Sequence, residues 1–130
     1  MTSVAGVRVR EATPGELPAV LNVLNGGGLT TDYARTERAI AAGDVVVAVA
    51  GPAGREERVL GALVLGGAEI TAVAVRRRRR AQGIGTALVE AADDRRQRLL
   101  AEFDAHVCSF WESLGFETRG LGDGRYRGRR

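Results

Sequence analysis

Residues 69–88, EITAVAVRRRRRAQGIGTAL, constrain the fold more than any other stretch of the chain. A half-apolar run ends in five arginines and is followed by Gly83-Ile84-Gly85 and by apolar residues at helical spacing. This order predicts a strand, a glycine turn and a helix. The first N–H groups of a helix have no intrahelical partner and lie at the positive end of its dipole. The turn is therefore suited to bind phosphate, with the arginines supplying further charge.

The spacing of the turn narrows the choice of phosphate ligand. A Walker loop needs Gly-Lys-Ser/Thr, and the chain has no lysine; a dinucleotide fingerprint needs a third glycine where Leu88 stands. What remains is R-x-x-G-x-G over residues 80–85, which resembles the acyl-CoA pyrophosphate loop of the GNAT superfamily of N-acetyltransferases. A second motif, FWESLGF over residues 110–116, resembles the aromatic-pair helix ending in Gly-Phe that this superfamily carries after its fifth strand.

The resemblance implies acetyl-CoA as co-substrate, a primary amine as acceptor, and direct transfer of the acetyl group between them. It places the pyrophosphate on the backbone of the glycine turn and the pantetheine arm along the preceding strand. The residues expected to bind acetyl-CoA are then Val73, Ala74, Val75, Arg80, Ala81, Gln82, Gly83, Ile84, Gly85 and Thr86.

Two residues are candidates for the catalytic steps. Strand alternation would put Glu69 on one face with Thr71, Val73 and Val75, and Glu69 matches the catalytic glutamate of the histone-acetylating branch of the family. A glutamate just after a Gly-Gly turn can equally be a solvated surface residue. Trp111 stands where the family often has a tyrosine that protonates the departing thiolate, and an indole N–H is not acidic enough for that role. It can instead pack in the core or flank CoA.

The remaining patterns predict one α/β (α+β) domain over residues 1–130, with a mixed, mostly antiparallel sheet and flanking helices. A capping box, Thr13-Pro14-Gly15-Glu16, begins the first helix, and Gly66-Gly67 is a candidate hairpin turn. The helix after the glycine turn is expected to run to about Gln97, and Asp104 to cap the last helix. The expected strands are 7–11, 44–50, 59–66, 69–75 and 99–103, followed by a hairpin over 117–129; the second helix is expected over 32–41.

Composition excludes several classes of function. One cysteine allows no internal disulfide, and one histidine leaves no histidine-rich metal site, so no metal is expected. No signal peptide or long apolar span is apparent, and we expect a cytoplasmic protein without membrane association. The net charge of +3 and the run of arginines over 76–80 would suit nucleic acid. All basic residues are arginine, however, and few aromatics are present for base stacking, so a phosphate-facing loop is favoured.

Three functions therefore remain, with the N-acetyltransferase favoured. The others are a CoA-binding sensor or interaction domain that has lost its chemistry, as Trp111 would permit, and an arginine-rich nucleic-acid binder. No motif in the sequence identifies the acceptor amine. Its specificity is expected from the 26–33 connection, the 51–58 loop and the carboxyl-terminal tail. The 26–33 connection is either a simple link between two helices or a loop that closes over the acceptor, with Thr30, Thr31, Asp32 and Tyr33 as candidate contacts. Formation of a homodimer is left open.

Overall fold

The computed structural model describes residues 4–26, 32–52 and 57–130. Within them, seven strands form one sheet: β1 (Val7–Glu11), β2 (Val45–Ala50), β3 (Arg58–Gly66), β4 (Glu69–Val75), β5 (Leu100–Asp104), β6 (Glu117–Gly122) and β7 (Arg125–Arg129). The α-helices are α1 (Leu17–Gly26), α2 (Tyr33–Ala41), α3 (Ile84–Asp93) and α4 (Cys108–Ser113), and short 3-10 turns precede α1, α3 and α4. The expected contacts Thr30 and Thr31 lie outside the described residues, as do residues 53–56 of the 51–58 loop.

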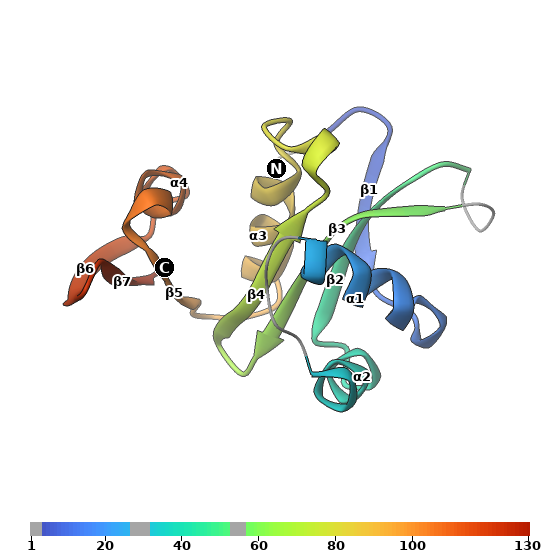
Figure 1. Cartoon of the computed structure of the whole chain (residues 1–130), viewed down its shortest axis with the longest axis horizontal. Helices are drawn as coiled ribbons and strands as arrows, with labels where there is room; N and C mark the ends of the chain where they lie inside the picture. Colours follow the sequence, from blue (N-terminus) through green and yellow to red (C-terminus); the bar gives the residue numbers. More distant parts are fainter. Residues whose placement is uncertain (1–3, 27–31, 53–56) are drawn as a thin grey trace.

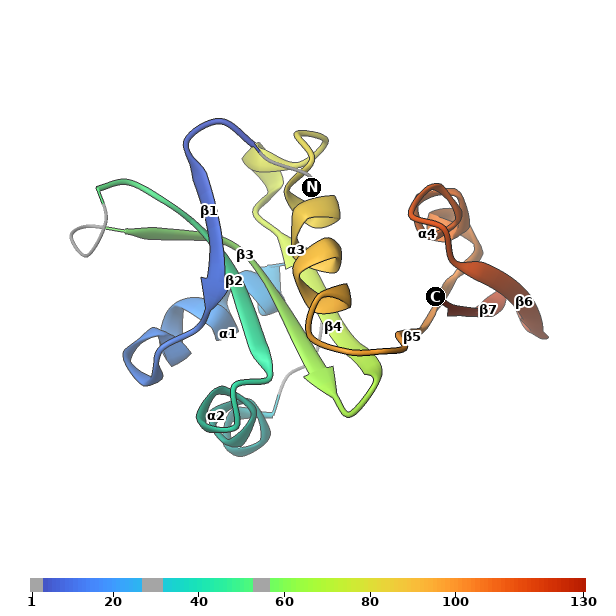
Figure 2. The same cartoon turned by 180° about the vertical axis from the view of Figure 1, so that it is seen from behind.

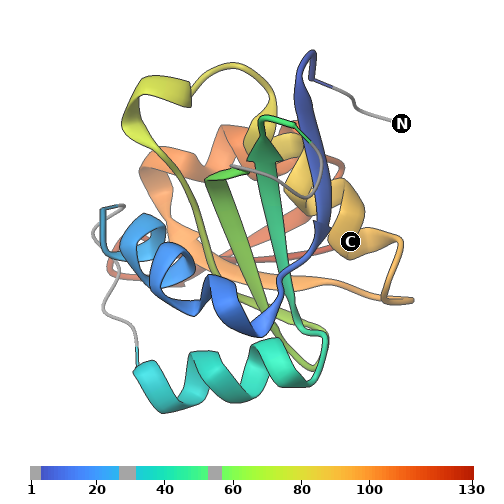
Figure 3. The same cartoon turned by 90° about the vertical axis from the view of Figure 1, so that its right-hand side faces the viewer.

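The strand order is β1-β2-β3-β4-β5-β7-β6, and every neighbouring pair is antiparallel except β4 and β5. The predicted mixed, mostly antiparallel α+β fold is confirmed. Helices α1 and α2 cover one face of β1–β4 and α3 covers the other (Figures 1 and 3). At the other end of the sheet, β5, β7, β6 and α4 form a group of their own (Figure 2).

Strand β2 is apolar at every position, and the structure shows why: helices lie on both faces of the sheet. Val46 packs in the core beneath α3, whereas Val45 and Val47 pack beneath α1 and α2. All three side chains are at most 1% exposed. A strand covered on both faces needs apolar residues at every position, so alternation is absent from its sequence.

Strand β4 departs from the regular alternation that its sequence predicts. Val64 of β3 pairs with Ala72 and Leu65 pairs with Ile70, so Thr71 is an extra residue in the ladder. The bulge shifts the alternation by one residue, so each residue after Thr71 faces the side opposite to the one that simple alternation predicts. Ile70, Val73 and Val75 pack on the α3 side of the sheet. The prediction that Glu69 shares a face with Val73 and Val75 is therefore wrong, because the bulge separates them.

Most other boundaries lie within one residue of prediction, and two differences have a cause that the contacts show. Helix α3 ends at Asp93 instead of near Gln97, because Arg96 leaves the helix and donates from Nε to the Gly67 carbonyl and from Nη2 to Asp44, both at 2.8 Å. The hairpin between β3 and β4 turns at Gly67 and Ala68 instead of Gly66-Gly67, since Gly66 already pairs with Glu69. Gly67 has φ +63, a conformation that favours glycine.

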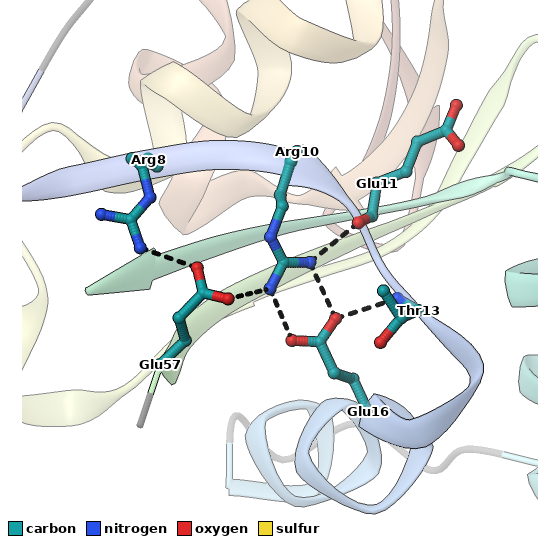
Figure 4. A network of polar contacts seen from close by, with 6 residues as sticks. All are labelled: Arg8, Arg10, Glu11, Thr13, Glu16 and Glu57. Atoms are coloured by element: carbon teal, nitrogen blue, oxygen red, sulfur yellow. Dashed lines mark hydrogen bonds and ion pairs between the residues drawn. The ribbon is translucent and has the colours of Figure 1, made fainter. Parts of the chain in front are cut away.

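The predicted capping box forms at the start of α1, and a network of ion pairs surrounds it (Figure 4). The carboxylate of Glu16 accepts from the Thr13 N–H at 2.9 Å and from both Nη groups of Arg10 at 2.9 and 2.8 Å. Glu57, next to β3, accepts from Arg8 at 2.7 Å and from Arg10 at 3.2 Å. The hydrogen bond from Arg10 holds the pKa of Glu16 below its ordinary value. The network ties β1, α1 and the start of β3 together.

Candidate functional site

The site is the gap that opens between β4 and β5. The two strands pair only at Glu69 with Leu100 and at Ile70 with Ala101, and beyond these pairs they diverge. A cavity of about 780 Å³ occupies the space between them. Among the residues expected to bind acetyl-CoA or take part in catalysis, the cavity is lined by Val73, Ala74, Val75, Arg80, Ala81, Gly83, Ile84, Gly85, Thr86 and Trp111.

One wall of the cavity is the backbone edge of β4. The Arg76 N–H donates to the Leu60 carbonyl of β3 at 2.8 Å. In an antiparallel pair the backbone groups of every second residue point to the same neighbouring strand, so this bond fixes which residues of β4 bond to β3. Ala74 points its backbone groups toward β3, and Val73 and Val75 point theirs into the gap. The Val75 carbonyl accepts there from Nε of Arg80 at 3.0 Å. A ligand in the gap can therefore extend the sheet by bonding to this edge.

The wide end of the cavity carries the glycine turn and the start of α3. Ala81 has φ +61 and Gly83 has φ +90, and both residues precede the first helical residue, Ile84. The first intrahelical acceptor is the Gly83 carbonyl, which receives the Ala87 N–H at 3.0 Å. Within the described parts of the chain, the backbone N–H groups of residues 81–86 donate to no acceptor. They form a group of donors at the positive end of a helix.

Two arginines add positive charge beside these donors. Arg79 and Arg80 line the cavity, and Nε of Arg79 is buried without a hydrogen-bond partner in the described structure. A buried donor without an acceptor destabilises the protein unless a ligand accepts its hydrogen bond. Arg77 and Arg78 are exposed and do not line the cavity. The turn therefore fits an anionic group of the phosphate kind.

Helix α4 closes the cavity from the α3 side. A Cβ on Gly85 would lie 3.5 Å from Cζ of Phe110, so the start of α3 and the aromatic helix are in close contact there. Trp111 is 5% exposed and stacks on Phe103 with a centroid distance of 5.4 Å. It also meets Phe110 and Phe116 edge to face. Trp111 thus belongs to the core and to the cavity wall together.

Two of the expected site residues do not line the cavity. Gln82 is exposed within the glycine turn. Glu69 is partly buried at the narrow end of the gap, and its carboxylate forms no hydrogen bond or ion pair with the described residues. The bulge at Thr71 puts it on the face away from α3, next to cavity-lining residues of the same strand.

Three charged residues that the sequence did not single out for the site do line it: Glu102, Asp104 and Arg125. Asp104 lies at the predicted N-cap position, before the 3-10 turn that leads into α4, but its side chain makes no capping hydrogen bond: the carboxylate accepts instead from Nη1 of Arg125 at 2.8 Å. This hydrogen bond lowers the pKa of Asp104. Alternation along β5 marks Glu102 and Asp104 as facing away from the core. That Arg125 lies beside them depends on the insertion of β7 between β5 and β6.

Within the described ranges, no group of three or more potential metal-binding side chains is found. No helix there has the length and apolar character needed to cross a membrane.

Several solved structures share this fold. A GNAT-family acetyltransferase from Listeria monocytogenes 4b F2365 has 13% identity and a TM-score of 0.73, covering 99% of this chain and 98% of its own. Rv2747 from Mycobacterium tuberculosis, solved in complex with CoA, has 18% identity and a TM-score of 0.76, with coverage of 94% and 97%. The PaiA N-acetyltransferase from Thermoplasma acidophilum, solved in complex with coenzyme A, has 11% identity and a TM-score of 0.72, with coverage of 95% and 98%.

Sequence comparison gives the family directly. No curated protein matches the chain. The family model described as acetyltransferase (GNAT) domain matches residues 37–118, which include β4, the glycine turn and the aromatic helix. Because this match covers more than half of the chain, the protein belongs to the GNAT family of acetyltransferases and is an acyltransferase.

Proposed function

We propose that the protein transfers an acetyl group from acetyl-CoA to a primary amine. The observation that carries this proposal is the cavity between β4 and β5, which joins an open strand edge to a turn whose N–H donors are unpaired among the described residues. A pyrophosphate suits the turn, and the amides of a pantetheine arm suit the backbone of Val73 and Val75. The relatives from M. tuberculosis and T. acidophilum that were solved with CoA support the same ligand.

The chemistry follows from the groups that would surround the thioester. The amine nitrogen attacks the carbonyl carbon, a C–N bond forms, and the C–S bond breaks to release the CoA thiolate. A backbone N–H of β4 in the gap would stabilise the charge that develops on the carbonyl oxygen. This contribution does not depend on side-chain identity.

Proton transfer is assigned to Glu69 in this proposal. An amine is protonated at neutral pH and must lose a proton before it can attack. Glu69 is partly buried and has no cationic partner among the described residues, so its carboxylate is available as a base, directly or through water. Trp111 cannot act as an acid, but a thiolate with a pKa of about 8.5 can leave and take its proton from water.

The test has two readouts. Acetyl-CoA binds the native state alone, so at about 100 times its dissociation constant it should stabilise the fold by about 2.7 kcal/mol and raise the melting temperature. Release of free CoA thiol in the presence of a panel of amines should then exceed release without them. A melting shift without amine-dependent release would favour the alternative, a CoA-binding sensor. The absence of any shift would refute acetyl-CoA as the ligand.

A further inference from the structure

The wall of the cavity away from α3 and α4 carries charged side chains. Ala101 and Phe103 of β5 pack in the core on the α3 side, so Glu102 and Asp104 project from the opposite face. Gly128 of β7 packs against the core residues Phe103 and Phe116, which directs Arg125 to the same opposite face. Glu102, Asp104 and Arg125 all line the cavity there.

These charges are paired but retain capacity for a ligand. Arg125 donates to Asp104 at 2.8 Å, and their side chains remain 46% and 56% exposed. Glu102 accepts from Arg127 at 3.0 Å and is 36% exposed. One hydrogen bond uses a single donor of a guanidinium that has five, and a carboxylate has several acceptor sites. A positive and a negative group thus lie side by side on the cavity wall, with hydrogen-bonding positions that no described residue uses.

This arrangement selects for a particular kind of amine. A simple alkylammonium would be attracted by Glu102 and Asp104 but repelled by Arg125. A ligand with an ammonium and a carboxylate on neighbouring atoms complements both signs of charge. Resting on the proposed acetyl transfer, we propose that the acceptor is an α-amino acid, whose carboxylate binds Arg125 while its amino group lies toward Glu102. The product is then an N-acetylated amino acid, and the proton lost from nitrogen passes to Glu69 or to water.

The strand offers a matched control. Arg129 makes the same kind of cross-strand pair, with Glu117 at 3.5 Å, but it does not line the cavity. The two substitutions Arg125→Gln and Arg129→Gln therefore remove the same charge from the same strand. Only the first removes it from the wall of the cavity.

The experiment compares leucine with isoamylamine, which lacks the carboxylate, and with leucinamide, in which a neutral amide replaces the carboxylate. The readout is kcat/KM for CoA release, and the remaining natural amino acids extend the panel. We expect the best amino acid to be preferred over its decarboxylated amine by about tenfold or more, the discrimination that a hydrogen-bonded charge supplies. Arg125→Gln should reduce the preference to a few-fold, chiefly through KM, with Arg125→Lys intermediate. Arg129→Gln should leave it unchanged.

Each result bears on the inference. A decarboxylated amine that reacts as well as its amino acid overturns it, as does turnover of an amine such as isoamylamine without turnover of any amino acid. An equal loss of preference in the Arg125 and Arg129 variants would also overturn it. The wild-type comparison needs no variant, so a failure of Arg125→Gln to fold does not remove the test. A lack of CoA release with every amine refutes the proposed function instead, whether or not acetyl-CoA shifts the melting temperature, which separates the two failures.

Discussion

Replacing Gly83 by valine tests whether the glycine turn binds through its backbone. Gly83 has φ +90, and a Cβ placed there would meet only Cγ2 of Val4, at an ordinary 3.5 Å. The cost is therefore conformational: about 1–2 kcal/mol for a left-handed L-residue, and more for a β-branched one. Relief of this strain would move the N–H groups that precede α3. The loss of one hydrogen bond to a charged ligand costs about 1.5–3 kcal/mol, which weakens binding by roughly 10- to 150-fold.

The assay is titration of the variant with acetyl-CoA by calorimetry, together with its thermal unfolding. Gly67→Val is the control, because Gly67 also has positive φ, +63, but lies outside the cavity. Both variants should lose similar stability, and only Gly83→Val should lose affinity. Arg77→Ala, at an exposed arginine, should weaken binding only a few-fold, because its charge is screened. Equal losses in the Gly83 and Arg77 variants would refute backbone recognition and favour binding through charge alone.

Three further outcomes are expected. Because Arg10 lowers the pKa of Glu16, their pair stabilises the fold above the ordinary value of 4.5 and is lost as the pH falls through the lower folded-state pKa. Urea unfolding should thus show Glu16→Gln to be less stable by roughly 1 kcal/mol at pH 7, with the difference vanishing in acid; a difference that is constant with pH would contradict this. Glu69→Gln should lower kcat by roughly 10² to 10⁴ without changing acetyl-CoA affinity, and the deficit should shrink toward about pH 10, where the amine needs no base. A deficit constant with pH would assign Glu69 a structural role. Trp111→Tyr should leave kcat equal or higher by supplying an acid, and complete loss of activity would show that the indole is needed for packing.

The sequence predicted the elements well where local chemistry determines them. The turn before α3 was readable because Gly83 and Gly85 follow a strand and precede an apolar helical stripe. The start of α1 was readable because Thr13 and Glu16 have the spacing of a capping box. The carboxyl-terminal hairpin over β6 and β7 was predicted as well.

Other features depended on contacts between distant residues and were not readable. The bulge at Thr71 comes from the register of β4 against β3, and EITAVAV alternates as well without it. The end of α3 depends on Arg96 reaching Asp44 and Gly67, more than twenty residues away in sequence. The group of charged residues on the cavity wall could not be predicted without the order of the strands, because the insertion of β7 beside β5 is what brings Arg125 to Asp104.

The junction of two residue pairs between β4 and β5 has a consequence for the cooperativity of unfolding. The hydrogen-bonded ladder between neighbouring strands normally makes them unfold together. Between β4 and β5 this ladder contains only the pairs at Glu69 and Ile70. The group of β5, β7, β6 and α4 can therefore open as a partly independent unit of lower local stability. In hydrogen exchange, the amides of β7 should exchange sooner than those of β2 in the free protein. A ligand that bonds to both walls would make the two ends of the sheet unfold as one.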